Sequence, residues 1–278
     1  ASCPKCQKRI KQLGIKGDAK HTKEEYLQSF VINHAEKFLN SKGRQIIGWD
    51  EILEGGLAPN ATVMSWRGEE GGIEAARQKH NVIMTPHTYL YFDYYQTYDI
   101  KNEPLAIGGR LPLERVYNYD PMPKMLSAEE QKYIVGVQAN LWTEYISTFR
   151  YAEYMLLPRL AALSEIQWCS ADKKNYECFL SRLPRMAQLY DLKQYNYATH
   201  AFDIARTLVP DSTEHTLKVA FKTIDNCPIH YTLDGTEPSA ASPLYTDTLM
   251  IKEACTISAV GIRPARKTRL FTETVNIP

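Results

Sequence analysis

The chain has 278 residues, which is enough to bury a large core in one large domain or two smaller ones. Its formal net charge of +1 gives no general attraction to nucleic acid or to anionic membranes, so neither partner is expected. No apolar run approaches the roughly 20 residues that a membrane-spanning helix needs. The first residues are neither basic nor apolar, so they do not read as a signal peptide.

A capping box at Thr22 and Glu25 predicts the start of a long helix, which Gly43 is expected to end. Apolar side chains then recur at helical spacing, which predicts a buried stripe on one face: Leu27, Phe30, Val31, His34 and Phe38. Because His34 lies on this stripe, we expect it to be a packed core histidine rather than a ligand.

Four short β-prone runs follow, at 45–48, 61–65, 82–85 and 133–138. Helical patterns separate or follow them, at 70–79, 152–167 and 179–190. Such alternation of strand and helix indicates an α/β fold with a parallel sheet. The stretch 97–124 is rich in Pro and Gly, and a loop of that length is typical of functional segments or short helices.

A large aromatic residue or an acid stands just beyond each of these runs: Trp49; Trp66; Tyr91 with Asp93; and Trp142 with Glu144. The carboxyl ends of parallel strands meet at one rim, where ligands bind, so we expect these side chains to converge on a single site. A broad aromatic face beside a carboxylate is suited to a sugar, because the ring packs on C–H groups and the acid accepts hydroxyls. The 18 tyrosines and 4 tryptophans of the chain agree with carbohydrate or peptide binding.

The texture of the sequence changes at about residue 210. Side chains alternate with period two at 216–222, 229–233, 255–260 and 269–275, which predicts a small antiparallel β-sandwich of the fibronectin or immunoglobulin type. We therefore expect an α/β domain over 1–200, a linker over 201–212 and an all-β domain over 213–278.

The six cysteines predict no metal site. Cys3 and Cys6 form a CxxC motif, but no second pair or histidine partner completes a set of four zinc ligands. The remaining cysteines allow a disulfide between 169 and 178 and another between 227 and 255.

Four segments resemble, in this order, the later strand-end motifs of the family 20 glycoside hydrolases, the β-N-acetylhexosaminidases: Gly48-Trp49-Asp50-Glu51-Ile52-Leu53, Ser65-Trp66-Arg67-Gly68, Tyr91-Phe92-Asp93 and Asn140-Leu141-Trp142-Thr143-Glu144. The segment 231–238 is similar to the small sandwich domain that follows the barrel in many bacterial members. The resemblance implies the C-terminal half, about four strands, of a (β/α)8 TIM barrel with its site at the carboxyl ends of the strands. It also implies no cofactor, and a periplasmic, cell-surface or secreted location.

The same resemblance implies a role for each site residue. Trp49, Trp66 and Trp142 would box in the terminal sugar and its acetamido group, and Tyr91 would take part in catalysis by positioning the acetamido carbonyl. Asp93 and Glu144 would bind sugar hydroxyls. The substrates would be glycans or glycoconjugates ending in β-linked N-acetylhexosamine. The implied mechanism is substrate-assisted and retaining: the acetamido oxygen attacks the anomeric carbon while a Glu protonates the leaving oxygen.

One motif of that family is absent. The His-x-Gly-Gly-Asp-Glu sequence that carries its catalytic acid pair does not occur here, and 3–6 resembles the stretch that follows the pair in bacterial members. We therefore expect the isolated chain to be inactive. We also expect it to need the missing N-terminal half of the barrel, or self-association, to cover its sheet edges and apolar face.

Two other hypotheses stay open. The chain could be a non-catalytic carbohydrate-binding protein that uses the same aromatic residues. It could instead be a glycosidase of another family, with Asp50 or Glu51 as the acid. This acid pair follows the first Trp, where family 20 does not place its acid, so we expect it to tie the strand exit to nearby backbone or basic groups.

Overall fold

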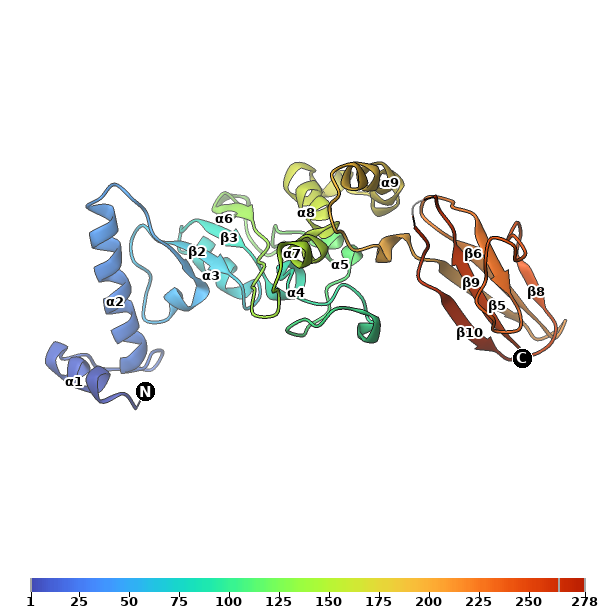
Figure 1. The fold of residues 1–278 in the computed structure, drawn as a ribbon. Helices are drawn as coiled ribbons and strands as arrows, with labels where there is room; N and C mark the ends of the chain where they lie inside the picture. The colour runs from blue at the N-terminus through green and yellow to red at the C-terminus, as the bar shows by residue number, and fades with distance from the viewer. Residues whose placement is uncertain (1, 265, 278) are drawn as a thin grey trace. The chain divides into compact units, whose positions relative to one another are not determined.

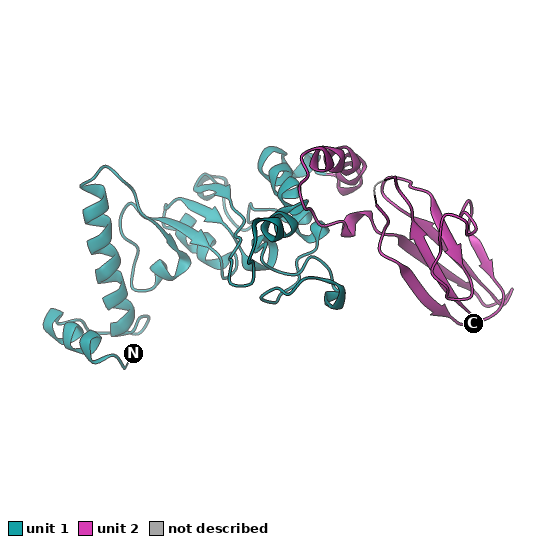
Figure 2. Cartoon of the chain, in the orientation of Figure 1, with its two compact units in different colours: residues 1–174 teal, residues 175–278 magenta. Residues whose placement is uncertain are grey.

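The computed structural model describes residues 2–264 and 266–277, which fall into two compact units, 1–174 and 175–278 (Figure 2). The first unit combines strands and helices, and the second carries the all-β part (Figure 1). The domain limits expected near residues 200 and 213 stay a prediction.

In the first unit, two helices precede a sheet of four parallel strands. The helices are α1 (Pro4–Leu13) and α2 (Lys23–Asn40). The strands lie in the order β1-β2-β3-β4, with β1 at Ile47–Trp49, β2 at Thr62–Ser65, β3 at Val82–Met84 and β4 at Ile134–Val137. The parallel α/β arrangement that the alternating pattern predicted is therefore present, with each expected strand within two residues of its observed start.

Helices and short 3-10 turns connect and follow these strands: η1 (Asp50–Leu53), α3 (Glu70–Arg77), α4 (His87–Leu90), η2 (Ile100–Asn102), α5 (Leu113–Asn118), α6 (Ala128–Gln131), α7 (Phe149–Leu156), α8 (Arg159–Trp168) and η3 (Ala171–Lys173). The helical pattern expected at 152–167 is divided between α7 and α8, because Pro158 cannot continue a helix in its interior. The long stretch 97–124 contains η2 and α5.

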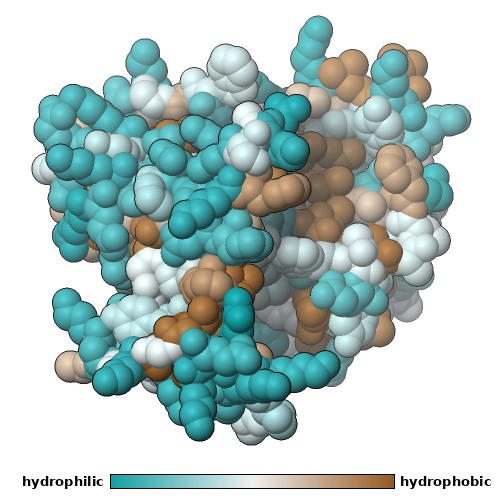
Figure 3. Space-filling view, turned by 90° about the vertical axis from the view of Figure 1, so that its left-hand side faces the viewer, coloured by the Kyte–Doolittle hydropathy of each residue, from teal (hydrophilic) through white to brown (hydrophobic). Residues whose placement is uncertain are grey.

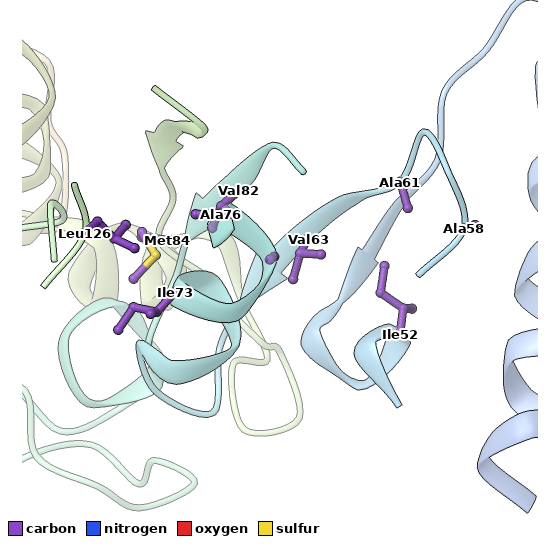
Figure 4. Close-up of a cluster of buried hydrophobic side chains, with 10 residues drawn as sticks. Ile52, Ala58, Ala61, Val63, Ile73, Ala76, Val82, Met84 and Leu126 are labelled. Atoms are coloured by element: carbon purple, nitrogen blue, oxygen red, sulfur yellow. The ribbon is translucent and has the colours of Figure 1, made fainter. Parts of the chain in front are cut away.

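The core of this unit lies between α3 and the sheet. Figure 4 shows Ile73 of α3 beside Met84 of β3 and Leu126, and all three are buried. Gly72 allows the helix to approach so closely, because a Cβ at that position would lie 2.7 Å from the Sδ of Met84. Each fully buried side chain of this size contributes about 1.5–3 kcal/mol to the free energy of unfolding.

The long helix α2 starts as predicted, but its apolar stripe is not buried. The Thr22 hydroxyl accepts the Glu25 N–H, and the Glu25 carboxylate accepts the Thr22 N–H, which completes the capping box. Phe30, Val31 and Phe38 are 38%, 56% and 60% exposed.

The expectation that His34 packs in the core is wrong, since this side chain is exposed as well. The helix instead docks through its polar face. The Ser29 hydroxyl donates to the Gly56 carbonyl at 2.9 Å, and buried Glu36 accepts the Asn60 N–H at 2.7 Å. Helical periodicity shows which side chains share a face, but not which surface that face meets.

The outer strands of the parallel sheet also carry exposed apolar side chains. Ile47 on β1 and Val135 on β4 are 55% and 56% exposed, whereas Val82 and Met84 on the inner strand β3 are fully buried. Hydrophobic side chains are visible among the polar ones in the space-filling view (Figure 3). Within the described residues, neither outer strand has a second sheet partner.

The second unit contains helix α9 (Tyr176–Leu192), the turn η4 (His200–Phe202) and two three-stranded antiparallel sheets. One sheet has the order β10-β9-β7 (Phe271–Val275, Cys255–Gly261, Ile229–Thr232) and the other β5-β6-β8 (Ala205–Asp211, Thr216–Lys222, Leu249–Ile251). Their core includes Val219, Phe221, Ile257 and Ala259. The antiparallel β part expected from the alternating pattern is therefore present.

Two of these strands were not expected from the sequence. β5 occupies 205–211, most of the stretch interpreted as a linker, and β8 has only three residues. β5 lies at a sheet edge with mainly exposed side chains and tolerates Pro210, so it shows no alternation of buried and exposed residues.

All six cysteines are free thiols, so neither of the disulfides that the spacing allowed is formed. Among the described residues, no helix is long and apolar enough to cross a membrane.

Candidate functional site

Four aromatic rings from the four strand exits form one continuous row. Trp49 ends β1, Trp66 follows β2, and Tyr91 and Trp142 lie beyond β3 and β4. The ring centroids of Trp49 and Trp142 are 5.7 Å apart, and those of Trp142 and Tyr91 6.3 Å. The Tyr91 and Trp66 rings stack at 6.2 Å with planes 18° apart. The structure thus brings together all four of the rings that the sequence predicted to converge at one rim.

Backbone hydrogen bonds fix the exits of β3 and β4 side by side. Asn140 donates its N–H to the Leu90 carbonyl at 2.8 Å, and its own carbonyl accepts the Phe92 N–H at 2.7 Å. The Asn140 side chain donates to the Thr85 hydroxyl at 2.6 Å. Because Asn140 stands two residues before Trp142, these bonds hold Trp142 beside the Tyr91 segment.

Asp50 and Glu51 hold the Trp66 segment. Asp50 is 1% exposed, and its carboxylate accepts the backbone N–H groups of Trp66 and Arg67 at 3.0 and 3.2 Å. It also accepts the Arg67 Nε–H at 2.6 Å, while Glu51 accepts the Trp66 indole N–H at 2.9 Å. This is the structural role expected for the pair.

Asp50 and Glu51 begin the 3-10 turn η1. Both reach the segment that begins at Trp66.

Asp93 presents a buried carboxylate oxygen beside the aromatic row. The residue is 4% exposed, and its Oδ1 has no hydrogen-bond partner within the described chain. Burial raises the pKa of the Asp93 carboxyl, and the charge of Glu144 adds to the rise. Hydrogen bonds from the backbone, including one from Trp142, and the charge of Arg159 oppose it. A buried acceptor without a partner is costly, so Asp93 suits a ligand that supplies a hydroxyl donor.

Glu144 lies close enough for its charge to act on Asp93, yet its own side chain is exposed. Tyr91 is 8% exposed, and burial raises the pKa of its phenol to about 12. The Tyr91 hydroxyl therefore remains protonated at neutral pH and can donate a hydrogen bond.

Two further aromatic side chains extend the cluster, and sequence reasoning assigned them no role. The His87 ring lies 6.0 Å from that of Tyr91 and 6.3 Å from that of Trp66. The Tyr94 hydroxyl is 3.2 Å from the His87 Nδ1. Their position in the aromatic run after β3 was the only available signal.

Arg159 was missed as well. It is fully buried behind the Tyr91–Asp93 segment, where it bonds the Phe92 and Tyr94 carbonyls. A lone cation after Leu-Leu-Pro in an apolar helix was the sequence signal that could have found it. Among the described residues, no cluster of His, Cys, Asp and Glu could hold a metal ion.

The four rings and the Asp93 carboxylate lie at the carboxyl ends of parallel strands, the edge at which α/β folds bind their ligands. Residues 1–171 match the family model described as glycosyl hydrolase family 20, catalytic domain, and residues 219–275 match the one described as Fn3 associated. The chain belongs to glycosyl hydrolase family 20.

Named relatives agree with this family. The chain is 42% identical to a β-hexosaminidase of Porphyromonas gingivalis over 99% of its own length and 36% of the relative. The chain thus spans about a third of that protein. The solved exo-β-N-acetylglucosaminidase of Vibrio harveyi, in complex with N-acetylglucosamine, is 32% identical with a TM-score of 0.61, over 70% of this chain and 30% of that one.

The β-N-acetylhexosaminidase of Bacteroides fragilis has a similar fold, with a TM-score of 0.57 at 22% identity, over 71% of this chain and 40% of that one. These solved members of the family imply a TIM-barrel-related fold for the α/β part of the chain.

Proposed function

We propose that this chain provides the aromatic sugar site of a β-N-acetylhexosaminidase. The complete enzyme would hydrolyse terminal, non-reducing β-linked N-acetylglucosamine or N-acetylgalactosamine from glycans and glycoconjugates, by substrate-assisted retaining catalysis. The observation that carries the proposal is the row of four rings beside the unpartnered oxygen of buried Asp93. The family and the named relatives support the same activity.

In this proposal the rings divide the sugar between them. Trp49, Trp66 and Trp142 pack on the C–H faces of the sugar ring and the acetamido methyl, which favours a dry aromatic slot. The protonated Tyr91 hydroxyl donates to the acetamido carbonyl and orients its oxygen toward the anomeric carbon. Asp93 and Glu144 accept hydroxyls of the sugar.

The general acid would come from outside this chain. Asp50 and Glu51 are the only adjacent Asp-Glu pair of the sequence. Asp50 is occupied by Trp66 and Arg67, and Glu51 by the Trp66 indole. We therefore propose that the isolated chain does not hydrolyse glycosides.

The unit that carries the site is also proposed to be half of a barrel. Its outer strands β1 and β4 expose Ile47 and Val135, and the apolar stripe of α2 is exposed too. Open strand edges and apolar surface of this kind favour association, either with the N-terminal half of the barrel or with a second copy.

The test is sugar binding without turnover. We expect the purified chain to bind N-acetylglucosamine weakly, as seen by ligand-observed NMR, and to prefer it to glucose. Trp142→Ala should abolish this binding, because Trp142 contacts both Trp49 and Tyr91. Trp168→Ala is the matched control, since that side chain is 91% exposed on α8, outside the row.

Hydrolysis of a chromogenic N-acetylglucosaminide separates the alternatives. Turnover by the isolated chain that Glu51→Gln abolishes would favour a glycosidase of another family. Binding of glucose and N-acetylglucosamine with equal affinity would contradict the proposed site.

A further inference from the structure

Among the described residues, Arg159 is the only fully buried cation, and it lies behind the Tyr91–Asp93 segment of the proposed sugar site. Arg159 is the first residue of α8 and is 0% exposed. Its guanidinium carbon lies over the Phe92 ring, 4.9 Å from the ring centroid. Burying an arginine is costly unless its charge and its donors are satisfied. Its surroundings must therefore supply both.

Carbonyl oxygens satisfy the donors of Arg159. The guanidinium donates to the Phe92 carbonyl at 2.5 Å and to the Tyr94 carbonyl at 3.1 Å, the residues on either side of Asp93. Further bonds reach the Leu111 carbonyl at 3.2 Å and the Met155 carbonyl at 3.1 and 2.5 Å. Four backbone carbonyls from three separate segments are thus joined at one side chain.

These carbonyls do not neutralise the charge. Burial lowers the pKa of Arg159 to about 9, and the two carboxylates that oppose this most are those of Glu103 and Asp93. Glu103 already accepts the backbone N–H groups of Gln96 and Thr97 and the Thr97 hydroxyl. Asp93 keeps one buried oxygen without a partner, although Arg159 grips the backbone on both sides of it.

We propose that Arg159 is the positioning residue of the sugar-binding carboxylate: it fixes the backbone of 92–94 and supplies a positive charge that favours the ionised form of Asp93, while leaving Asp93 Oδ1 free for a sugar hydroxyl. A direct ion pair would occupy the Asp93 oxygens. Holding the neighbouring carbonyls instead gives the carboxylate a counter-charge and leaves its acceptor available. The sugar part of this inference rests on the proposed function, and the charge part does not.

The first measurement needs no sugar. The Asp93 carboxyl is titrated by NMR in the full chain labelled at aspartate carbonyl carbons, with Asp93→Asn to assign its signal. The charged groups that act on it are Arg159 and Glu144, and the phenols of Tyr91 and Tyr94 feel its charge in turn. We expect Arg159→Met to move the Asp93 titration to higher pH and Arg159→Lys to keep it near the wild-type position. An unchanged titration in Arg159→Met overturns the charge part.

Lys174→Met is the matched control. Lys174 is a partly buried cation that donates to two carbonyls, those of Tyr117 and Tyr119, and it is not among the main groups that shift the pKa of Asp93. The control should leave the Asp93 titration in place. If Arg159→Met does not fold, Arg159→Lys is the deciding variant. A lysine keeps the positive charge but cannot donate to all four carbonyls. It should therefore leave the Asp93 titration near wild type and still weaken sugar binding severalfold.

The second measurement is a double-mutant cycle on the affinity for N-acetylglucosamine. Arg159→Met should lower the affinity at least about tenfold, the size of one lost charged hydrogen bond. If Arg159 acts through Asp93, the double variant with Asp93→Asn should bind no more weakly than Asp93→Asn alone. Additive losses would overturn positioning through Asp93. Absence of binding by the wild-type chain would refute the proposed sugar site, while the titration still decides the charge pairing.

Discussion

At the scale of single residues, one buried carboxylate organises a wall of the candidate site. Asp50 accepts two backbone N–H groups and a guanidinium from the segment at Trp66 and Arg67, and Glu51 adds a bond to the indole. The position of the Trp66 ring is therefore set by the hydrogen bonds that its segment donates to Asp50 and Glu51 of η1, as well as by its stacking on Tyr91.

We predict that Asp50→Ala lowers the free energy of unfolding by about 2–4 kcal/mol, because it leaves buried N–H donors without an acceptor. Urea unfolding followed by tryptophan fluorescence measures this loss. Glu54→Ala is the control, since it removes only the bond to the exposed arm of Arg67 and should cost about 0–1 kcal/mol. Equal losses in the two variants would contradict the role of Asp50.

A second prediction at this scale concerns pH. Burial raises the pKa of Tyr91 to about 12, above the value near 10 of an exposed tyrosine. The stability that the neutral phenol contributes is then fully present below about pH 10 and is lost as the pH rises through about 12. The difference in tyrosinate absorbance between the wild type and Tyr91→Phe should show a midpoint near 12. A midpoint near 10 would show that the phenol is open to solvent.

At the scale of elements, α2 shows that a capping box predicts where a helix begins, whereas an apolar stripe does not by itself predict which face is buried. The box at Thr22 and Glu25 is local, and the structure contains it as the sequence predicted. The stripe depends on which surface the helix meets, and here a polar face with Ser29 and Glu36 makes the contact. An amphipathic helix can therefore present its apolar side outward when a loop on its other side offers both a carbonyl acceptor and an N–H donor to its polar side chains.

We predict that replacing Val31 and Phe38 together by glutamate changes the free energy of unfolding by less than about 0.5 kcal/mol, since both side chains are exposed. The same variant should reduce self-association in sedimentation velocity runs. Ser29→Ala with Glu36→Ala on the opposite face should do the reverse, lowering stability and leaving association unchanged. Strong destabilisation by the glutamates would mean that the stripe belongs to a core.

At the scale of the whole molecule, the two units differ in how far each closes on itself. The second unit places two sheets around a shared core of Val219, Phe221, Ile257 and Ala259. The first unit buries α3 against one face of its sheet, yet leaves Ile47, Val135 and the α2 stripe exposed. Independent stability is therefore expected of the second unit in particular.

We predict that residues 175–278 expressed alone unfold in one cooperative transition by heat or urea. The expected reason is the core that the two sheets share, in which Val219, Ile257 and Ala259 are fully buried. Circular dichroism and tyrosine fluorescence should give coincident unfolding curves. Tyrosine is the suitable probe because this segment contains no tryptophan. A gradual transition without a midpoint would show that the sheets depend on the first unit.

The sequence predicted best what depends on local pattern. The strands ending near Trp49 and Trp66, and the row that joins these rings through Trp142 and Tyr91, follow from short β-prone runs with aromatic exits. Arg159 and the hydrogen bonds of Asn140 were missed, because most of their partners are backbone carbonyls and a hydroxyl tens of residues away in the chain, which no sequence period encodes. β5 escaped because an exposed edge strand has no buried face to create alternation.

The link between Asn140 and the Leu90–Phe92 backbone has a consequence for diversification of the site. These bonds hold the chain just before Trp142. The chain beyond Glu144 can therefore change in length or composition without moving the Trp142 ring. If the proposed sugar site is correct, changes in this outer loop alter the selectivity for the group attached to the sugar. The position of the Trp142 ring does not depend on that loop.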